Sequence, residues 1–295
     1  MNRFMIGQFD KFNFEKQKRD YRDDFYGIEV CHMDTVEDLE IVKSYVEEHN
    51  IKVGFHFPVL NHQWRFRDPQ YLSLNKQTQN ESYNYMAKEF DRAKAFNPHY
   101  VLTHYPKPVI LDEDVDWSNW RFADRSEYYF EKEYTYDHFV DQSDIFFKWL
   151  SEQGEKHGFM PILELDAVNA YIYDSDFLEN QLKQYSNIKL CLDIGRIHLQ
   201  DCIDPNFDGL LFVGKYAPYT ELVHLWNVKV DNNVSCGHYP ALESLSKDEG
   251  WADVEAYLKR ISQENNTYKI LFEHKSHLIS EEELQNCYNW IQRLV

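Results

Sequence analysis

Six histidine and carboxylate residues follow short apolar runs of this chain, at positions where buried β-strands would end. They are His56 in VGFHFP, His104 in YVLTHYP, Glu164 in PILELD, Asp193 in LCLDIG, His224 in LVHLWN and Glu273 in ILFEHK. An ionised carboxylate is costly on a strand that is buried on both faces, so each of these residues needs a polar partner. Imidazoles and carboxylates together bind divalent cations. The pattern therefore predicts that the strand ends converge on one metal-binding centre.

Eight apolar or β-branched runs are predicted to be the strands that position these residues. They cover residues 3–9, 26–33, 51–59, 99–106, 159–167, 188–195, 221–230 and 268–276. Amphipathic segments separate them, and two capping boxes, Thr35 with Asp38 and Ser280 with Glu283, mark helix starts. Strands that alternate with helices form a parallel sheet, and eight such units predict a closed TIM (β/α)8 barrel. A doubly wound open sheet is the alternative, but no glycine-rich nucleotide loop supports it.

The chain shows no linker-like stretch, so residues 1–295 are expected to form a single domain. Two long segments, 60–75 and 106–135, follow predicted strands. Loops after barrel strands lie on the catalytic face. These two segments are therefore predicted to be active-site loops, and their aromatic residues favour order over disorder.

Composition narrows the class of protein. The formal net charge of −19 argues against a broad nucleic-acid or anionic-membrane surface, although a local basic pocket remains compatible with it. The five cysteines are scattered and odd in number, which does not suggest a disulfide framework. No apolar run reaches membrane-spanning length, and the first residues lack a secretory pattern. We expect a cytoplasmic protein with no membrane partner, and a homo-oligomer stays open.

Five motifs occur in the order found in one known superfamily. They are LELD, LDIGRIH, HLWN, GHYP followed by GWADV, and LFEH. With them the whole chain resembles the xylose isomerase-like TIM barrel superfamily, which groups sugar isomerases and epimerases with AP-endonucleases. The resemblance implies one metal held by Glu164, Asp193, His224 and Glu273, and it implies that Glu164 and Glu273 are the acid–base pair. His56 and His104 match the positions that hold a second metal in some members.

The chain departs from the superfamily at one motif. Arg196 stands where a histidine is usual, and Cys236-Gly-His238 replaces an Asp-x-His. Arginine has no lone pair to donate, so a third zinc of the endonuclease type is not expected. Arg196 would instead offer a positive fork to a carboxylate or phosphate. Together with His238, Trp64 and Trp226, it is predicted to contact substrate.

These residues predict an enzyme for a small-molecule carbohydrate, with Mn, Mg, Co or Zn as its divalent metal ion. A cation chelated by a substrate carbonyl and hydroxyl would stabilise an enediolate, and two glutamates would transfer the proton. The predicted activity is isomerisation or epimerisation of a small sugar or sugar derivative. The alternatives are a metal-dependent phosphodiester hydrolase of the AP-endonuclease type, which the acidic charge disfavours, and a non-catalytic ligand-binding barrel.

Overall fold

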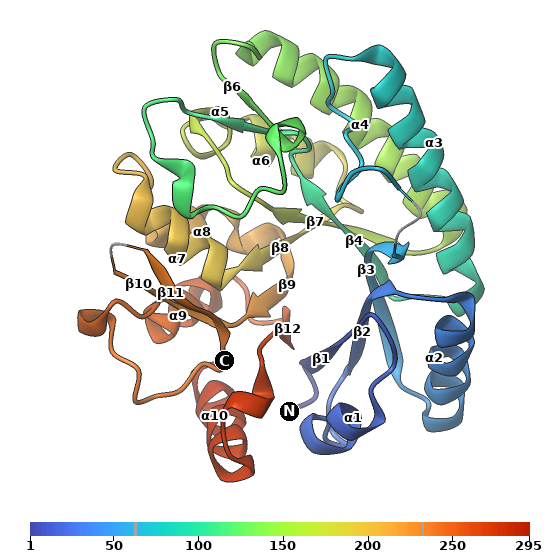
Figure 1. Cartoon of the computed structure of the whole chain (residues 1–295), viewed down its shortest axis with the longest axis vertical. Coiled ribbons are helices and arrows are strands. Elements are labelled where there is room, and N and C mark those ends of the chain that lie inside the picture. Colours follow the sequence, from blue (N-terminus) through green and yellow to red (C-terminus); the bar gives the residue numbers. More distant parts are fainter. Residues whose placement is uncertain (62–63, 232) are drawn as a thin grey trace.

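The computed structural model describes residues 1–61, 64–231 and 233–295. Eight parallel strands form a closed barrel, and the helices surround it (Figure 1). In chain order the barrel strands are β1 (Phe4–Phe9), β2 (Gly27–Met33), β3 (Lys52–Leu60), β4 (Tyr100–Tyr105), β7 (Met160–Leu165), β8 (Lys189–Asp193), β9 (Thr220–Leu225) and β12 (Lys269–Phe272). The barrel closes where β1 pairs with β12. The predicted TIM barrel is confirmed.

Helices follow most barrel strands and cover the outside of the barrel. They are α1 (Phe14–Asp20), α2 (Val36–His49), α3 (Lys76–Ala93), α4 (Tyr136–His157), α5 (Ala170–Tyr173), α6 (Phe177–Gln184), α7 (Ile194–Ile203), α8 (Gly209–Tyr216), α9 (Val254–Glu264) and α10 (Glu281–Leu294). Both predicted capping boxes form, at Thr35 before α2 and at Ser280 before α10. None of the described helices is long and apolar enough to cross a membrane.

Apolar side chains fill the inside of the barrel below the strand ends. This inner cluster consists of Met5, Tyr100, Leu102, Ile162, Cys191, Leu222 and Leu271. Side chains alternate between the two faces of a strand, so the residue two positions later points into the barrel again. Leu102, Ile162, Cys191, Leu222 and Leu271 are followed in this way by His104, Glu164, Asp193, His224 and Glu273. The alternation therefore sets five of the six chemical residues above an apolar floor.

The predicted strand 221–230 is wrong in its second half. β9 ends at Leu225, and β10 (Asn227–Val230) leaves the barrel to pair antiparallel with β11 (Val234–Tyr239). The neighbouring strands β8 and β12 pair with β9 only as far as His224 and Leu225. Beyond that point the backbone needs other hydrogen-bond partners, and a hairpin supplies them.

The long segments 60–75 and 106–135 both lie at the end of the barrel where the chemical residues meet. Residues 62–63 of the first segment lie outside the described residues. The second contains β5 (Val109–Leu111) and β6 (Tyr128–Phe130), which pair in parallel, and two short 3₁₀ helices, η2 (Trp117–Asn119) and η3 (Arg125–Glu127). Trp117 and Trp120 pack with Trp226 in a separate apolar cluster. The segment is thus anchored by its own aromatic residues.

Candidate metal and catalytic site

The structure brings the four predicted metal ligands together at the carboxyl end of the barrel. Glu164 lies on β7, Asp193 ends β8, His224 lies on β9, and Glu273 follows β12. Asp193, His224 and Glu273 each offer a donor atom within 4.8 Å of those of the other two. His224 Nδ1 lies 3.3 Å from Glu273 Oε2 and 3.5 Å from Glu164 Oε2. Donors from the ends of four separate strands therefore meet at one centre.

Asp193 is held in place from two sides. It is the N-cap of α7, and its Oδ1 accepts a hydrogen bond from the backbone N–H of Arg196. Its Oδ2 accepts a hydrogen bond of 3.0 Å from the indole Nε1 of Trp226. Trp226 is itself buried and stacks on the ring of His238, with the ring centroids 4.2 Å apart. Trp226 is thus placed to orient Asp193, a candidate metal ligand. Substrate contact by Trp226 and His238 stays a prediction.

His224 has the environment of a metal ligand. Its Nε2 lies 3.3 Å from Glu29 Oε2, and the Tyr100 hydroxyl donates to the same oxygen at 2.7 Å. A carboxylate beside one ring nitrogen of a histidine accepts a hydrogen bond from the N–H there. The lone pair is then on the other nitrogen. Nδ1 is buried without a hydrogen-bond partner among the described residues, and it faces the carboxylates of Glu164 and Glu273. His224 Nδ1 and the carboxylate oxygens of Glu164 and Glu273 are three acceptors that face each other, and a cation fits between them.

His56 and His104 form a second group with Glu164. His56 Nδ1 lies 2.9 Å from the carbonyl oxygen of Phe57, and His104 Nδ1 lies 2.7 Å from Asp68 Oδ1. In each ring Nδ1–H is therefore a donor, and Nε2 faces Glu164. The Nε2 atoms lie 3.1 Å and 3.5 Å from Glu164 Oε2. A cation or a proton would fit between these Nε2 atoms and the Glu164 carboxylate. A second metal here stays a prediction.

Arg196 lies between the two groups. Its Nη1 is 2.7 Å from Asp166 Oδ1, and its Nε is 3.1 Å from Glu164 Oε1 and 3.4 Å from Asp193 Oδ2. Its Nη2 is 3.4 Å from His104 Nε2. The guanidinium therefore binds carboxylates of the protein itself, from its position beside the ligands. Its binding of a substrate anion stays a prediction.

The carboxylates of the site compete for the positive charge around them. Burial raises the pKa of Glu164, but His104, His224 and Arg196 outweigh burial and hold it well below its usual value. Burial, together with the Glu164 charge, raises the pKa of Asp193. Glu164 is thus kept ionised, whereas the positive charge near Asp193 does not offset its burial and the charge of Glu164. A divalent cation would stabilise the ionised form of both.

A buried ion-pair network next to the site was not predicted from the sequence. We define it as Arg67, Asp68, Lys107, Asp166 and Arg196. Lys107 is fully buried, and its Nζ lies 2.9 Å from Asp68 and 2.5 Å from Asp166. Arg67 pairs with Asp68 at 3.4 Å, and Trp120 donates to Asp166 at 3.1 Å. The network ties both long segments to the barrel and, through Asp68, orients His104.

Some predicted residues lie away from the ligands. Trp64 stacks on Tyr85 of α3, with the ring centroids 4.8 Å apart, and packs at the edge of the main core. Glu29, which is not among the predicted site residues, is buried and supports His224. Strand alternation places Glu29 on the inward face of β2, and this was the sequence signal that could have identified it. Asp166, inside LELD, and Asp68 gave no such signal because their partners lie far along the chain.

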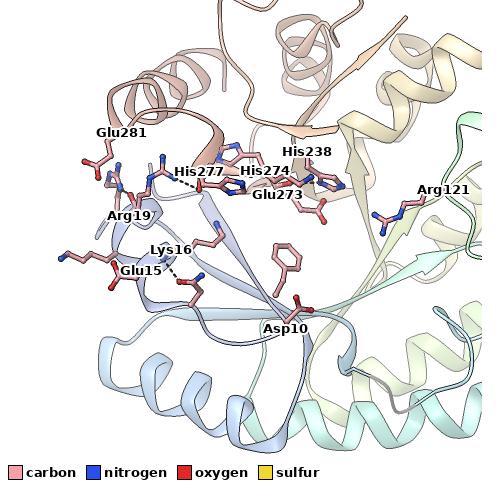
Figure 2. A pocket seen from close by; sticks show the side chains of 16 residues that line it. Asp10, Glu15, Lys16, Arg19, Arg121, His238, Glu273, His274, His277 and Glu281 are labelled. Atoms are coloured by element: carbon pink, nitrogen blue, oxygen red, sulfur yellow. Dashed lines mark hydrogen bonds between the residues drawn. The ribbon is translucent and has the colours of Figure 1, made fainter. Parts of the chain in front are cut away.

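A cavity of about 1150 Å³ opens beside Glu273 and His238, and we call it the trough. Its wall is formed by α1, by the turn between β1 and α1, and by the segment after β12 (Figure 2). The side chain of Glu273 is 17% exposed, whereas that of Glu164 is 1% exposed. Of the two glutamates, Glu273 therefore faces the space through which a ligand could reach the site.

Comparison with known proteins finds likeness in structure. No family model matches the sequence, and neither does any curated protein sequence. A D-tagatose 3-epimerase-like protein has a TM-score of 0.63 at 16% identity, covering 99% of this chain and 96% of that one. The 3-keto-D-glucoside 4-epimerase of E. coli has a TM-score of 0.61 at 11% identity, covering 99% and 100%. A xylose isomerase-like TIM barrel protein from Mycobacterium smegmatis, in complex with magnesium, has 0.51 at 13% identity, covering 90% and 84%. The chain therefore shares the TIM-barrel fold of these proteins.

Proposed function

We propose that the protein is a divalent-metal-dependent isomerase or epimerase of a small sugar or sugar derivative. The observation that carries this proposal is the convergence of Glu164, Asp193, His224 and Glu273 on one centre at the barrel mouth. The donor set, one imidazole and three carboxylates, suits Mn, Mg, Co or Zn. Two of the similar folds carry the names of sugar epimerases, and a third was solved with magnesium.

The two glutamates would share the proton transfer. When bound, the cation would supply Lewis-acid polarisation of the substrate carbonyl. Glu273 would reach the substrate from the trough, and Glu164 would act from the inner side, beside His56 and Arg196. Because its positive neighbours keep Glu164 ionised, it is in the form that a general base requires. One glutamate would remove the proton next to the carbonyl, and the other would return one.

A phosphodiester hydrolase is less well supported. The third zinc of the AP-endonucleases requires a histidine where this chain has Arg196, and the Arg196 guanidinium is already paired with three carboxylates. A non-catalytic barrel would have no need of two glutamates on one ligand centre. The proton-transfer test below separates this last alternative from an enzyme.

Exchange of substrate protons with solvent tests the proposed reaction. The metal-loaded protein, incubated in D₂O with a panel of ketoses, should introduce deuterium next to the carbonyl of its substrate, as measured by NMR or mass spectrometry. Glu164→Gln and Glu273→Gln should each slow this exchange by about 10²–10⁴-fold. Glu221→Gln is the matched control, because Glu221 lies on β9 near the opposite end of the barrel. Undiminished exchange in either site variant would contradict the proposal.

Metal content is measured independently of turnover. Mass spectrometry of the purified protein should find one or two equivalents of a divalent metal, and His224→Ala should lose most of it. Glu221→Gln should keep it. Failure to bind metal even after reconstitution would rule out the proposed chemistry.

A further inference from the structure

The trough has a basic lining in a chain whose net charge is −19. Its six basic residues are Lys16, Lys18, Arg19, Arg22, Arg121 and Lys275, and its four acidic residues are Asp10, Glu15, Glu273 and Glu281. Within the described part of the chain, Lys16 is the one basic residue of this set that forms a salt bridge, with Asp20. Basic residues therefore outnumber acidic ones in the cavity that leads to Glu273, and most of them form no salt bridge among the described residues.

His274 provides a second, independent sign of a ligand site. It lines the trough and is 5% exposed, and neither of its ring nitrogens has a hydrogen-bond partner among the described residues. Figure 2 shows it next to Glu273 on the wall of the cavity. Buried polar atoms are almost always satisfied by protein, water or ligand, because leaving them unpaired is costly. An imidazole in this position can donate one N–H to a group in the trough.

Hydrogen bonds connect the two parts of the wall around His274. Arg19 of α1 donates hydrogen bonds of 3.3 Å to Ser276 Oγ and 2.6 Å to the carbonyl oxygen of Ile279. These bonds join α1 to the segment after β12. A guanidinium has five N–H donors, so Arg19 keeps donors for a further acceptor. Lys275 is exposed on the same segment and has no side-chain partner among the described residues.

We propose that the trough is the subsite for an anionic group, a phosphate or a carboxylate, carried by the substrate. This inference rests on the proposed function, because it places the anionic end relative to the reacting carbons at Glu273. Arg19 and Lys275 attract the charge, and His274 donates a hydrogen bond to it. Glu273 and His274 both line the trough, so one small molecule in the trough can reach both. The substrate is thus an anionic sugar derivative.

Binding measurements test the subsite without requiring turnover. Isothermal titration of the metal-loaded full chain, at constant ionic strength, would compare D-fructose with D-fructose 6-phosphate and with the keto-acid D-fructuronate. At least one anionic ketose should bind about tenfold or more tightly than D-fructose, since a charge-assisted hydrogen bond strengthens binding by about that factor. Preference for the phosphate or for the carboxylate identifies the source of the anion.

Two variants of matched charge locate the effect. Lys275→Glu should remove most of the anionic preference, whereas Lys148→Glu should preserve it. Lys148 is likewise exposed and has no side-chain partner among the described residues, but it lies on α4, away from the trough. If Lys275 contributes little to the anionic preference, Arg19→Gln removes a second positive charge from the trough. Equal affinity for neutral and anionic ketoses, or a preference that both trough variants leave intact, would overturn the subsite. Anion binding that depends on Lys275, in a protein without proton exchange, would leave the subsite standing and refute the proposed function.

Discussion

The two sides of the barrel mouth use charge in opposite ways. Above β4 and β7, Lys107 is fully buried between Asp68 and Asp166, and the two long segments cover it. Beside β1 and β12, Lys275 is exposed at the edge of the trough, and basic residues there outnumber acidic ones. We call these the closed side and the open side.

The difference follows from burial. A buried charge must be paired, so on the closed side each cation fixes the position of a loop carboxylate. An exposed charge is solvated and needs no partner, so on the open side it remains available to a ligand. The closed side therefore holds His104 and Arg196 rigidly, while the open side gives access to Glu273. The predictions below test this division of roles.

Lys107→Met should have the largest effect. The substitution leaves Asp68 and Asp166 buried with one cation fewer, and breaking a buried pair in this way costs about 3–5 kcal/mol of unfolding free energy. Urea denaturation would measure the loss. A loss below about 1 kcal/mol would show that the closed side is not held by this network.

Glu29→Gln should lower the affinity of the site for metal without changing the ion pairs of the closed side or the lining of the open side. The amide oxygen can still accept the hydrogen bond from Tyr100, but the negative charge beside His224 Nε2 is lost. Loss of such a supporting carboxylate lowers metal affinity by about 10–100-fold. Competition with a chelating dye would measure this affinity, and Glu221→Gln serves again as the control. Unchanged affinity would mean that Glu29 only fills space beneath His224.

Acid should destabilise the closed side specifically. Burial raises the pKa of Asp68, but His104 and Lys107 outweigh burial and hold it well below its usual value. The folded state therefore favours the ionised form, so this stabilisation is complete above the unfolded-state pKa, about 3.9, and is lost as pH falls below it. As pH falls below about 4, unfolding free energy should fall more steeply in the wild type than in Asp68→Asn. Equal slopes would contradict the assignment.

Lys275→Met should have the smallest effect on stability. Its side chain is exposed and unpaired among the described residues, so the unfolding free energy should change by no more than about 0.5 kcal/mol. Because Lys107→Met makes the same chemical change on the closed side, the pair compares the two sides directly. A loss similar to that of Lys107→Met would remove the distinction between them.

Local sequence patterns predicted much of the fold and the convergence of the candidate ligands at the barrel mouth. All eight barrel strands form, and so do both capping boxes, because alternation and capping act over a few residues. The same alternation explains why Glu164, Asp193, His224 and Glu273 point into one barrel mouth. The prediction failed at residues 227–230, where the apolar pattern continues but the neighbouring strands end.

Tertiary structure alone decided which charges are paired. Lys107 and Asp166 are 59 positions apart in the chain, and Arg196 and His104 are 92 apart. No local pattern distinguishes the buried Lys107 from the exposed Lys275, since both follow strand ends and both are basic. Their burial depends on how the connecting segments fold over the mouth. The strand pattern thus determined where the chemical residues converge, because neighbours in the chain set strand periodicity. The closed network and the open trough arose from long-range packing, which sets the solvation, and with it the role, of each charge.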